Sequence, residues 1–199
     1  MYEIQTYLGA DGLMHCTVCK EPVEAFYPKG SLLEMRKHHR QCACERKAYA
    51  EEAQYYKEKE HRELIARNKK ICFEEKEMEG FTFQNVERDS GVIRIAEEYV
   101  TNWQKMKQNH MGYLFWGPVG TGKSYLAACI ANALLEKEVT VKMTNFNTIL
   151  NDLFAAEDKT EYIRLLNGYE LLIIDDLGVE RSSEYALENI FGVIDWRNL

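Results

Sequence analysis

Apolar and polar positions divide the chain into a short N-terminal stretch, a charged middle and a longer apolar part. Residues 1–44 hold turn-forming Gly and Pro with few apolar residues between them, too few to bury a core of their own. Residues 45–70 contain no Gly or Pro, are rich in Glu/Lys pairs three or four apart, and carry only a weak apolar stripe. This pattern predicts an N-terminal module over 1–44 and an exposed helix within a linker over 45–79.

The rest of the chain, 80–199, shows the alternation of strands and helices that is typical of an α/β domain. A helix is expected over 92–108, where Ile93, Ala96, Val100 and Trp103 recur at helical spacing. Strands are then expected over 112–116, 140–144 and 171–174, and helices over 123–136, 148–154, 161–166 and 183–196. Such alternation predicts a parallel sheet with helices on both faces.

A phosphate-binding motif follows the first of these strands. The residues from Gly117 to Ser124 read G-P-V-G-T-G-K-S and directly precede an apolar helix, which is the context that a P-loop requires. Its glycines allow backbone N–H groups to face phosphates, Lys123 reaches the outer phosphates, and the Ser124 hydroxyl ligates Mg²⁺. The expected nucleotide-binding residues are Gly117, Pro118, Val119, Gly120, Thr121, Gly122, Lys123, Ser124 and Tyr125.

The strand expected over 171–174 ends in two carboxylates, Asp175 and Asp176. A buried strand of this kind carries its charges only at its tip. Asp175 is placed to hold Mg²⁺ through water, and Asp176 to orient or deprotonate the water that attacks the γ-phosphate. Many ATPases of this type have Glu at the second position, and Asp is one methylene shorter. The expected catalytic set is Lys123, Asp175 and Asp176.

Four of the six cysteines form two pairs in the N-terminal module, Cys16 with Cys19 and Cys42 with Cys44. The sequence shows no targeting pattern and no apolar run of the length that a membrane helix needs, so a cytoplasmic location is expected. Because thiols stay reduced there, the pairs predict a tetrahedral Zn²⁺ site. A Cys₃His set is an alternative, as are free thiols or redox pairing; the nearby histidines are His15, His38 and His39. Cys129 is expected in the core.

Charge is distributed unevenly along the chain, whose net charge is −7. Residues 36–70 hold eleven Lys or Arg against six Glu, whereas residues 113–199 hold seven against thirteen Asp or Glu. The basic side chains around the second Cys pair could contact single-stranded DNA or an acidic partner, or form a solvated face. They are Arg36, Lys37, Arg40, Arg46 and Lys47.

The runs GPVGTGKSYLAACIANALL and LLIIDDLGVERSSEYALENIFGVIDWR resemble the AAA+ ATPases of the DnaC/DnaI helicase-loader group, which share their core with IstB transposition ATPases. The resemblance spans about residues 81–197. The Cys segment resembles the metal-binding front end of DnaI-like loaders, which IstB-type proteins generally lack. The resemblance implies a P-loop AAA+ sheet in the order 5-1-4-3-2, ATP as cofactor, a replicative hexameric helicase as partner, and self-association through the ATPase domain.

The resemblance also implies that part of the ATPase fold is missing. Only three of the five strands are found, and the family's sensor Asn and arginine finger would follow Leu199. We therefore expect a chain that binds nucleotide, hydrolyses it poorly alone, and is marginally stable or aggregation-prone, because a missing interior strand leaves two apolar edges unpaired. A helicase loader is the leading hypothesis. The alternatives are a transposition regulator of the IstB type and a non-catalytic partner-binding fragment.

Overall fold

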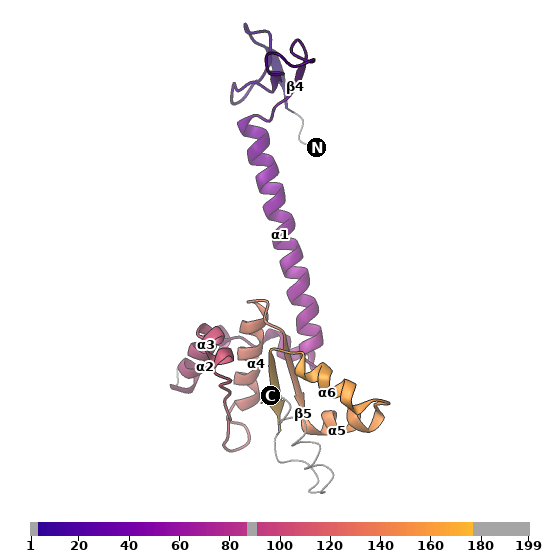
Figure 1. The fold of residues 1–199 in the computed structure, drawn as a ribbon. Coiled ribbons are helices and arrows are strands. Elements are labelled where there is room, and N and C mark those ends of the chain that lie inside the picture. The colour runs from indigo at the N-terminus through magenta and orange to yellow at the C-terminus, as the bar shows by residue number, and fades with distance from the viewer. Residues whose placement is uncertain (1–3, 87–90, 177–199) are drawn as a thin grey trace. The chain divides into compact units, whose positions relative to one another are not determined.

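The computed structural model describes residues 4–86 and 91–176 of the chain. The chain forms two compact units, residues 1–62 and 63–199, and the boundary between them falls inside a single helix, α1 (Ala43–Cys72). Figure 1 shows this helix as one continuous element. The boundary lies within the segment 45–79 that the sequence assigned to a linker.

The N-terminal unit contains two small antiparallel hairpins before α1. The paired strands are β1 (Thr6–Leu8) with β2 (Met14–Cys16), and β3 (Glu24–Phe26) with β4 (Lys37–His39). Cys16, Val23 and Cys42 are its buried core residues, so the unit has little apolar interior. The sequence predicted no strands here, because three-residue strands are too short to show an alternating pattern.

Helix α1 begins with one half of a capping box. Cys42 precedes its first residue, and the Cys42 N–H donates to the Glu45 carboxylate at 3.0 Å, which is the side-chain half of a capping box. Glu45 is 7% exposed although it is charged. Most of the remaining helix is exposed, as the sequence predicted, and Ile65 and Cys72 are its buried apolar residues.

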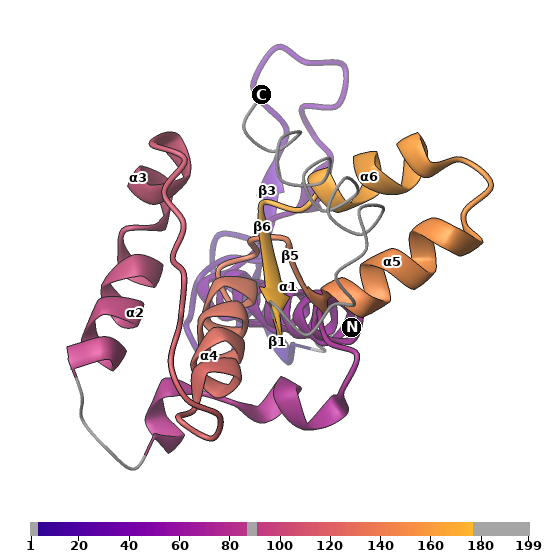
Figure 2. The same cartoon turned by 90° about the horizontal axis from the view of Figure 1, so that it is seen from below.

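The C-terminal unit is built around two parallel strands, β5 (Val141–Asn145) and β6 (Leu171–Asp175). Leu171 and Ile173 of β6 pack into one apolar cluster, whereas Leu172 and Ile174 pack into another. This alternation places apolar side chains on both faces of the strand pair, and Figure 2 shows α2 and α4 on one side of the strands and α5 and α6 on the other. The arrangement confirms the predicted α/β class with parallel strands.

The helices of this unit match most of the predicted ranges within a few residues. They are α2 (Gly91–Thr101), α3 (Trp103–Gln108), α4 (Lys123–Leu135), α5 (Phe146–Ala155) and α6 (Lys159–Asn167), with 3₁₀ turns at Lys76–Gly80 and Phe83–Asn85. The helix expected over 183–196 lies outside the described residues. Across 4–86 and 91–176, no helix combines the length and apolar character needed to cross a membrane.

The single helix predicted over 92–108 is wrong, because the chain breaks at Asn102 between α2 and α3. Two side chains next to the break bond back to carbonyls of the preceding turn. The Thr101 hydroxyl donates to the Glu97 carbonyl at 2.8 Å, and the Asn102 amide donates to the Glu98 carbonyl at 3.0 Å. Such bonds compete with the helical ladder and favour a bend, which apolar spacing alone does not reveal.

The strand predicted over 112–116 is also wrong, since these residues form no strand. A strand requires a hydrogen-bonded neighbour, and β6 pairs only with β5 among the described residues. Phe115 packs against the main core, but Leu114 is 72% and Trp116 88% exposed. For the same reason β6 is half-buried along its length rather than fully buried as expected.

Candidate nucleotide and metal sites

The loop that precedes α4 adopts backbone angles that its glycines allow. Gly117, Gly120 and Gly122 have φ angles of 146°, 81° and 83°, a region that residues with a Cβ rarely adopt. A Cβ added at Gly120 or Gly122 would meet no atom within 4 Å, so the backbone angle rather than crowding requires glycine there. Gly122 is the N-cap of α4, and the loop therefore leads directly into the positive end of a helix.

Two side chains hold this loop together. The Lys123 amine donates to the carbonyls of Gly117 at 3.0 Å and Pro118 at 2.9 Å. The Thr121 hydroxyl also donates to the Pro118 carbonyl, at 2.9 Å. The Lys123 amine is thus held by carbonyls of its own loop, and the loop residues 117–122 are exposed.

The two carboxylates expected after the apolar strand lie where β6 ends. Asp175 is its last residue and pairs in register with Asn145, the last residue of β5. Asp176 follows with a φ of 50°, and its N–H donates to the Asp175 carboxylate at 3.0 Å. The strand ladder therefore fixes the backbone of Asp175, whereas Asp176 leaves the strand through a left-handed turn.

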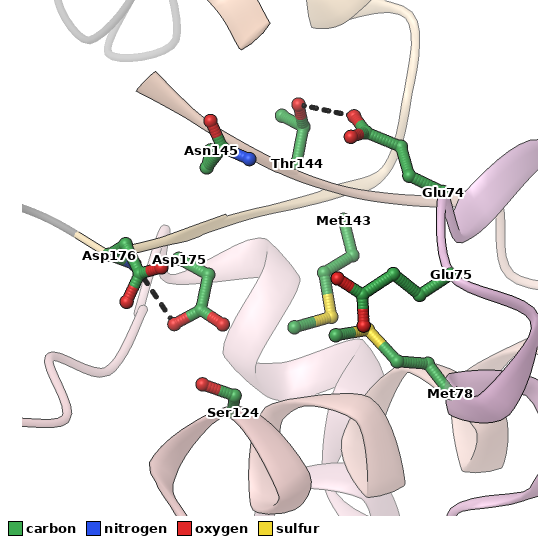
Figure 3. A pocket seen from close by; sticks show the side chains of 9 residues that line it. All are labelled: Glu74, Glu75, Met78, Ser124, Met143, Thr144, Asn145, Asp175 and Asp176. Atoms are coloured by element: carbon green, nitrogen blue, oxygen red, sulfur yellow. Dashed lines mark hydrogen bonds between the residues drawn. The ribbon is translucent and has the colours of Figure 1, made fainter. Parts of the chain in front are cut away.

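Ser124 and Asp175 meet in one pocket of about 240 Å³. The pocket is lined by Glu74, Glu75, Met78, Ser124, Met143, Thr144, Asn145, Asp175 and Asp176. Figure 3 shows Ser124 on α4 facing the Asp175 side chain across this space. Two predicted motifs that lie far apart in sequence are thus brought together, and their hydroxyl and carboxylate oxygens are ligands that suit Mg²⁺.

Sequence reasoning missed the part of the pocket that comes from the segment after α1. Glu74 accepts hydrogen bonds from the hydroxyls of Thr144 at 3.0 Å and Thr148 at 3.4 Å, which ties this segment to β5 and α5. Its neighbour Glu75 lines the same pocket. The Glu-Glu pair was visible in the sequence, but no motif connects it to the P-loop.

Tyr125, predicted to contact nucleotide, packs against the segment that precedes α2. Its ring stacks on Phe81 with ring centroids 4.5 Å apart, and its hydroxyl donates to the Thr82 carbonyl at 3.4 Å. Burial raises the pKa of the Tyr125 hydroxyl. Contact between Tyr125 and a nucleotide stays a prediction.

The four N-terminal cysteines converge on one point. The Sγ atoms of Cys16, Cys19, Cys42 and Cys44 all lie within 4.8 Å of one another. Four thiolates at Zn–S distances of about 2.3 Å in a tetrahedron would be about 3.8 Å apart, so the cluster fits Zn²⁺. Cys42 and Cys44 also lie at the start of α1, where the helix dipole favours thiolates.

The thiols of this cluster differ in acidity. A hydrogen bond from the Glu21 N–H leads the causes that lower the pKa of Cys19 to about 6. Burial, together with hydrogen bonds with Cys19 and Cys16, raises the pKa of Cys44 to about 12. Bringing four such groups together without a cation therefore favours the neutral form of some of them.

The histidines near the cluster are engaged elsewhere. The His15 ring nitrogens lie 2.9 Å from the Lys20 carbonyl and 3.0 Å from the Asp11 carboxylate, and both contacts raise the His15 pKa. His38 Nδ1 lies 3.0 Å from the His39 carbonyl, and His39 Nε2 lies 3.3 Å from Glu45. Within the part of the chain that is described, the metal-ligand cluster consists of cysteines alone, which favours the Cys₄ set over Cys₃His. Cys129 is fully buried, as predicted.

Residues 47–198 match a protein-family model described as "IstB-like ATP binding protein". Among curated proteins, the replicative helicase loader DnaC of Escherichia coli is 29% identical over 117 residues, covering 56% of this chain and 46% of DnaC. The replicative helicase loader DnaI of Bacillus subtilis is 24% identical over 131 residues, covering 63% of this chain and 42% of DnaI. The chain thus spans somewhat under half the length of these relatives.

A solved structure has a similar fold. The crystal structure of DnaI superposes with a TM-score of 0.52 at 26% sequence identity, covering 67% of this chain and 74% of that chain. The likeness supports assignment of the C-terminal unit to the P-loop AAA+ fold that the sequence resemblance predicted.

Proposed function

Because this chain belongs to the family of IstB-like ATP-binding proteins, we propose that it binds ATP with Mg²⁺ and uses hydrolysis of the γ-phosphate to support loading of a replicative helicase onto DNA. The meeting of Ser124 and Asp175 in one pocket at the start of α4 carries the proposal. A P-loop alone holds phosphates, whereas a P-loop joined to a strand-end carboxylate also holds the metal that the reaction requires.

The residues would divide the chemistry as follows. The loop N–H groups and the α4 N-terminus hold the phosphates, and the Lys123 amine turns from the loop carbonyls to the outer phosphates. Ser124 and Asp175 would hold Mg²⁺, which supplies charge neutralisation on the phosphate oxygens. Asp176, at the turn after β6, would orient the attacking water for in-line displacement.

The helicase-loading role is supported by the relatives rather than by the pocket. DnaC and DnaI are named replicative helicase loaders, and this chain shares their ATPase region. We assign contact with a replicative hexameric helicase to the N-terminal unit and α1, and self-association to the ATPase unit. A cytoplasmic location follows from this role.

Single-stranded DNA is a weaker candidate partner for the basic residues near the cysteines. Lys37 pairs with Glu24, Arg46 with Glu21, and Lys47 with Glu51. Arg36 and Arg40 are the members of this set without an ion pair to any described residue. Internal pairing of three of the five cations leaves less charge for phosphates and favours a protein partner.

The proposal includes a structural Zn²⁺ in the N-terminal unit. The spacing of the four Sγ atoms fits the ion, and the small core of this unit leaves folding energy to be supplied by a metal. Zinc here would fix the two hairpins against the first turn of α1. It would take no part in the ATPase reaction.

Nucleotide binding is the first test. Calorimetric titration of the whole chain with ATP and Mg²⁺ is expected to show binding to one site, and Lys123→Ala is expected to weaken it by at least tenfold. Lys105→Ala, a change on the exposed surface of α3, serves as the matched control and should leave affinity unchanged. No binding by the unaltered chain, or equal loss in both variants, would refute the proposed site.

The partner is a separate test. Co-purification with a replicative hexameric helicase supports the loader role, whereas a complex with a transposase and target DNA would support the IstB-type alternative. The match to the family of IstB-like ATP-binding proteins is the observation that favours this second candidate. Nucleotide binding without turnover, even after a complementary C-terminal fragment is added, would point to a non-catalytic binding fragment.

A further inference from the structure

The pocket beside Ser124 contains a carboxylate to which the mechanism above gives no role. Glu75 lies between the end of α1 and the 3₁₀ turn at Lys76–Gly80, and it lines the pocket together with Ser124 and Asp175. Figure 3 shows its side chain extending from this segment toward the middle of the pocket, beside Met143 and Met78. Its carboxylate makes no hydrogen bond or ion pair with any residue in the described ranges.

The backbone of Glu75 is held in place from both sides. On one side, Glu74 is bonded to the hydroxyls of Thr144 and Thr148. On the other, the Met78 N–H donates to the Glu75 carbonyl at 3.1 Å, and the buried Asn132 amide donates to the Met78 carbonyl at 2.7 Å. The free carboxylate therefore starts from a fixed position, while its own oxygens remain available to a ligand.

Magnesium bound with a nucleotide usually keeps several of its waters and takes only one or two ligands from the protein. Those waters donate hydrogen bonds, and a carboxylate just outside the coordination shell is a suitable acceptor. We propose that Glu75 is a positioning residue for Mg²⁺, accepting hydrogen bonds from the ion's waters opposite Asp175. The inference rests on the proposed nucleotide site and adds a second carboxylate wall to it.

This role has an electrostatic consequence that can be measured. Without the metal ion, the Glu75 charge repels the phosphates of ATP. With the ion present, the same charge attracts the Mg²⁺ that is bound to ATP. Glu75 should therefore increase the dependence of ATP affinity on Mg²⁺. A purely structural residue would have no such effect of opposite sign in the two conditions.

The test compares ATP affinity in EDTA and in saturating Mg²⁺ for the whole chain, by calorimetry or by competition with a fluorescent ATP analogue. Glu75→Gln is expected to bind metal-free ATP more tightly and to lose roughly three- to tenfold of the enhancement by Mg²⁺. This loss is smaller than the 10–100-fold loss of metal affinity that is typical when an outer-shell partner is removed, because the Glu75 side chain is exposed and its charge is screened. For Glu75→Asp, which keeps the charge, the enhancement of ATP affinity by Mg²⁺ should fall between that of the unaltered chain and that of Glu75→Gln.

Glu74→Gln is the matched control, because it removes the charge of the neighbouring residue in the same pocket, whose carboxylate already accepts hydrogen bonds from Thr144 and Thr148. It should lower stability and shift both ATP affinities in the same direction. An unchanged Mg²⁺ enhancement in Glu75→Gln would overturn the role of Glu75, as would an equal loss of both affinities in Glu75→Gln and Glu75→Asp. If the unaltered chain binds no ATP in either condition, the proposed function fails instead.

Discussion

At the scale of single residues, the cysteine cluster shows what short-range spacing can predict. Cys16 with Cys19, and Cys42 with Cys44, are close in sequence, so each pair can reach one ion with little constraint on the rest of the chain. The structure adds what the spacing could not show, namely that both pairs meet and that Cys42 is also the residue before α1. Metal binding and the start of the helix are thus coupled in one residue.

Removal of one ligand should therefore remove the metal and unfold the N-terminal hairpins. We expect Cys16→Ser to lower the zinc content from about one ion per chain to well under half, with loss of the hairpins. Elemental analysis of the purified chain, with circular dichroism before and after a chelator, measures both effects. Cys129→Ala, which alters a buried cysteine of α4, should keep the zinc. A folded N-terminal unit with no zinc in the unaltered chain would contradict the Cys₄ assignment.

Glu75 could not be predicted in the same way. Ser124 and Asp175 each belong to a motif whose chemistry is legible in sequence, whereas Glu75 reaches the pocket only because Glu74 and Asn132 hold its segment. A contact between elements far apart in the chain has no local signal. Pairs of acidic residues on exposed surface are also common, so the sequence alone favours a solvated pair with no role in the site.

At the scale of elements, α4 organises the C-terminal unit. It begins at the P-loop, and one polar residue on it, Asn132, is 2% exposed in an otherwise apolar stretch. The Asn132 amide donates to the carbonyls of Met78 at 2.7 Å, Phe81 at 3.0 Å and Ala128 at 3.0 Å. The helix of the P-loop is thereby fastened to the segment that carries Glu75.

Substitution of Asn132 should test this fastening. Asn132→Ala leaves two carbonyls of the segment without their donor and is expected to cost about 1–3 kcal/mol of the free energy of unfolding. Asn132→Asp should cost more, because an ionised carboxylate only accepts hydrogen bonds and would face three carbonyl oxygens. Urea unfolding monitored by tryptophan fluorescence gives both values. A smaller loss for Asp than for Ala would show that the amide does not act as the donor.

A second link joins α3 to the start of β6 and depends on pH. Glu170 pairs with Lys107 and accepts from the Thr140 N–H at 3.2 Å, and the Lys107 contact is the largest cause of its lowered pKa. Because the folded pKa is below the ordinary Glu value of 4.5, the stabilisation is complete above that value and is lost as pH falls through the folded pKa. Both side chains are partly exposed, so its size should be about 1 kcal/mol or less.

The expected result is a difference in stability between the unaltered chain and Glu170→Gln that disappears in acid. Glu170→Gln should be less stable than the unaltered chain at pH 7, and the two should converge as the pH falls through the folded pKa of Glu170. Urea unfolding at a series of pH values measures this convergence. A constant difference across the series would mean that packing, not ionisation, accounts for the effect.

The elements that could be predicted are those with a local pattern. Helices α4, α5 and α6 and strands β5 and β6 lie within a few residues of their expected ranges, because apolar periodicity is local. The strand expected over 112–116 has a suitable apolar pattern, but strand formation also needs a hydrogen-bonded neighbour. That requirement is not local, and no described residue meets it.

At the scale of the whole molecule, the open side of β6 and the apolar stretch 112–116 both favour association with another chain. Leu114 is 72% exposed and Trp116 88% exposed, and the second edge of β6 has no ladder partner among residues 4–86 and 91–176. Unpaired strand edges can pair with another chain, and exposed apolar side chains favour association as well. We therefore expect the protein to self-associate through this region as its concentration rises.

A charge placed in the stretch should reduce this association without changing the fold. Leu114→Lys is expected to lower the mass-average size in sedimentation or light scattering at high concentration, because burying an ammonium group between strands is costly. Leu165→Lys is the matched control: Leu165 is 64% exposed and lies within a helix, α6, so its substitution should leave association unchanged. A monomeric unaltered chain, or equal effects of the two substitutions, would refute this role for the open edge. Association that falls only with Leu114→Lys would identify residues 112–116 as the surface that another strand must cover.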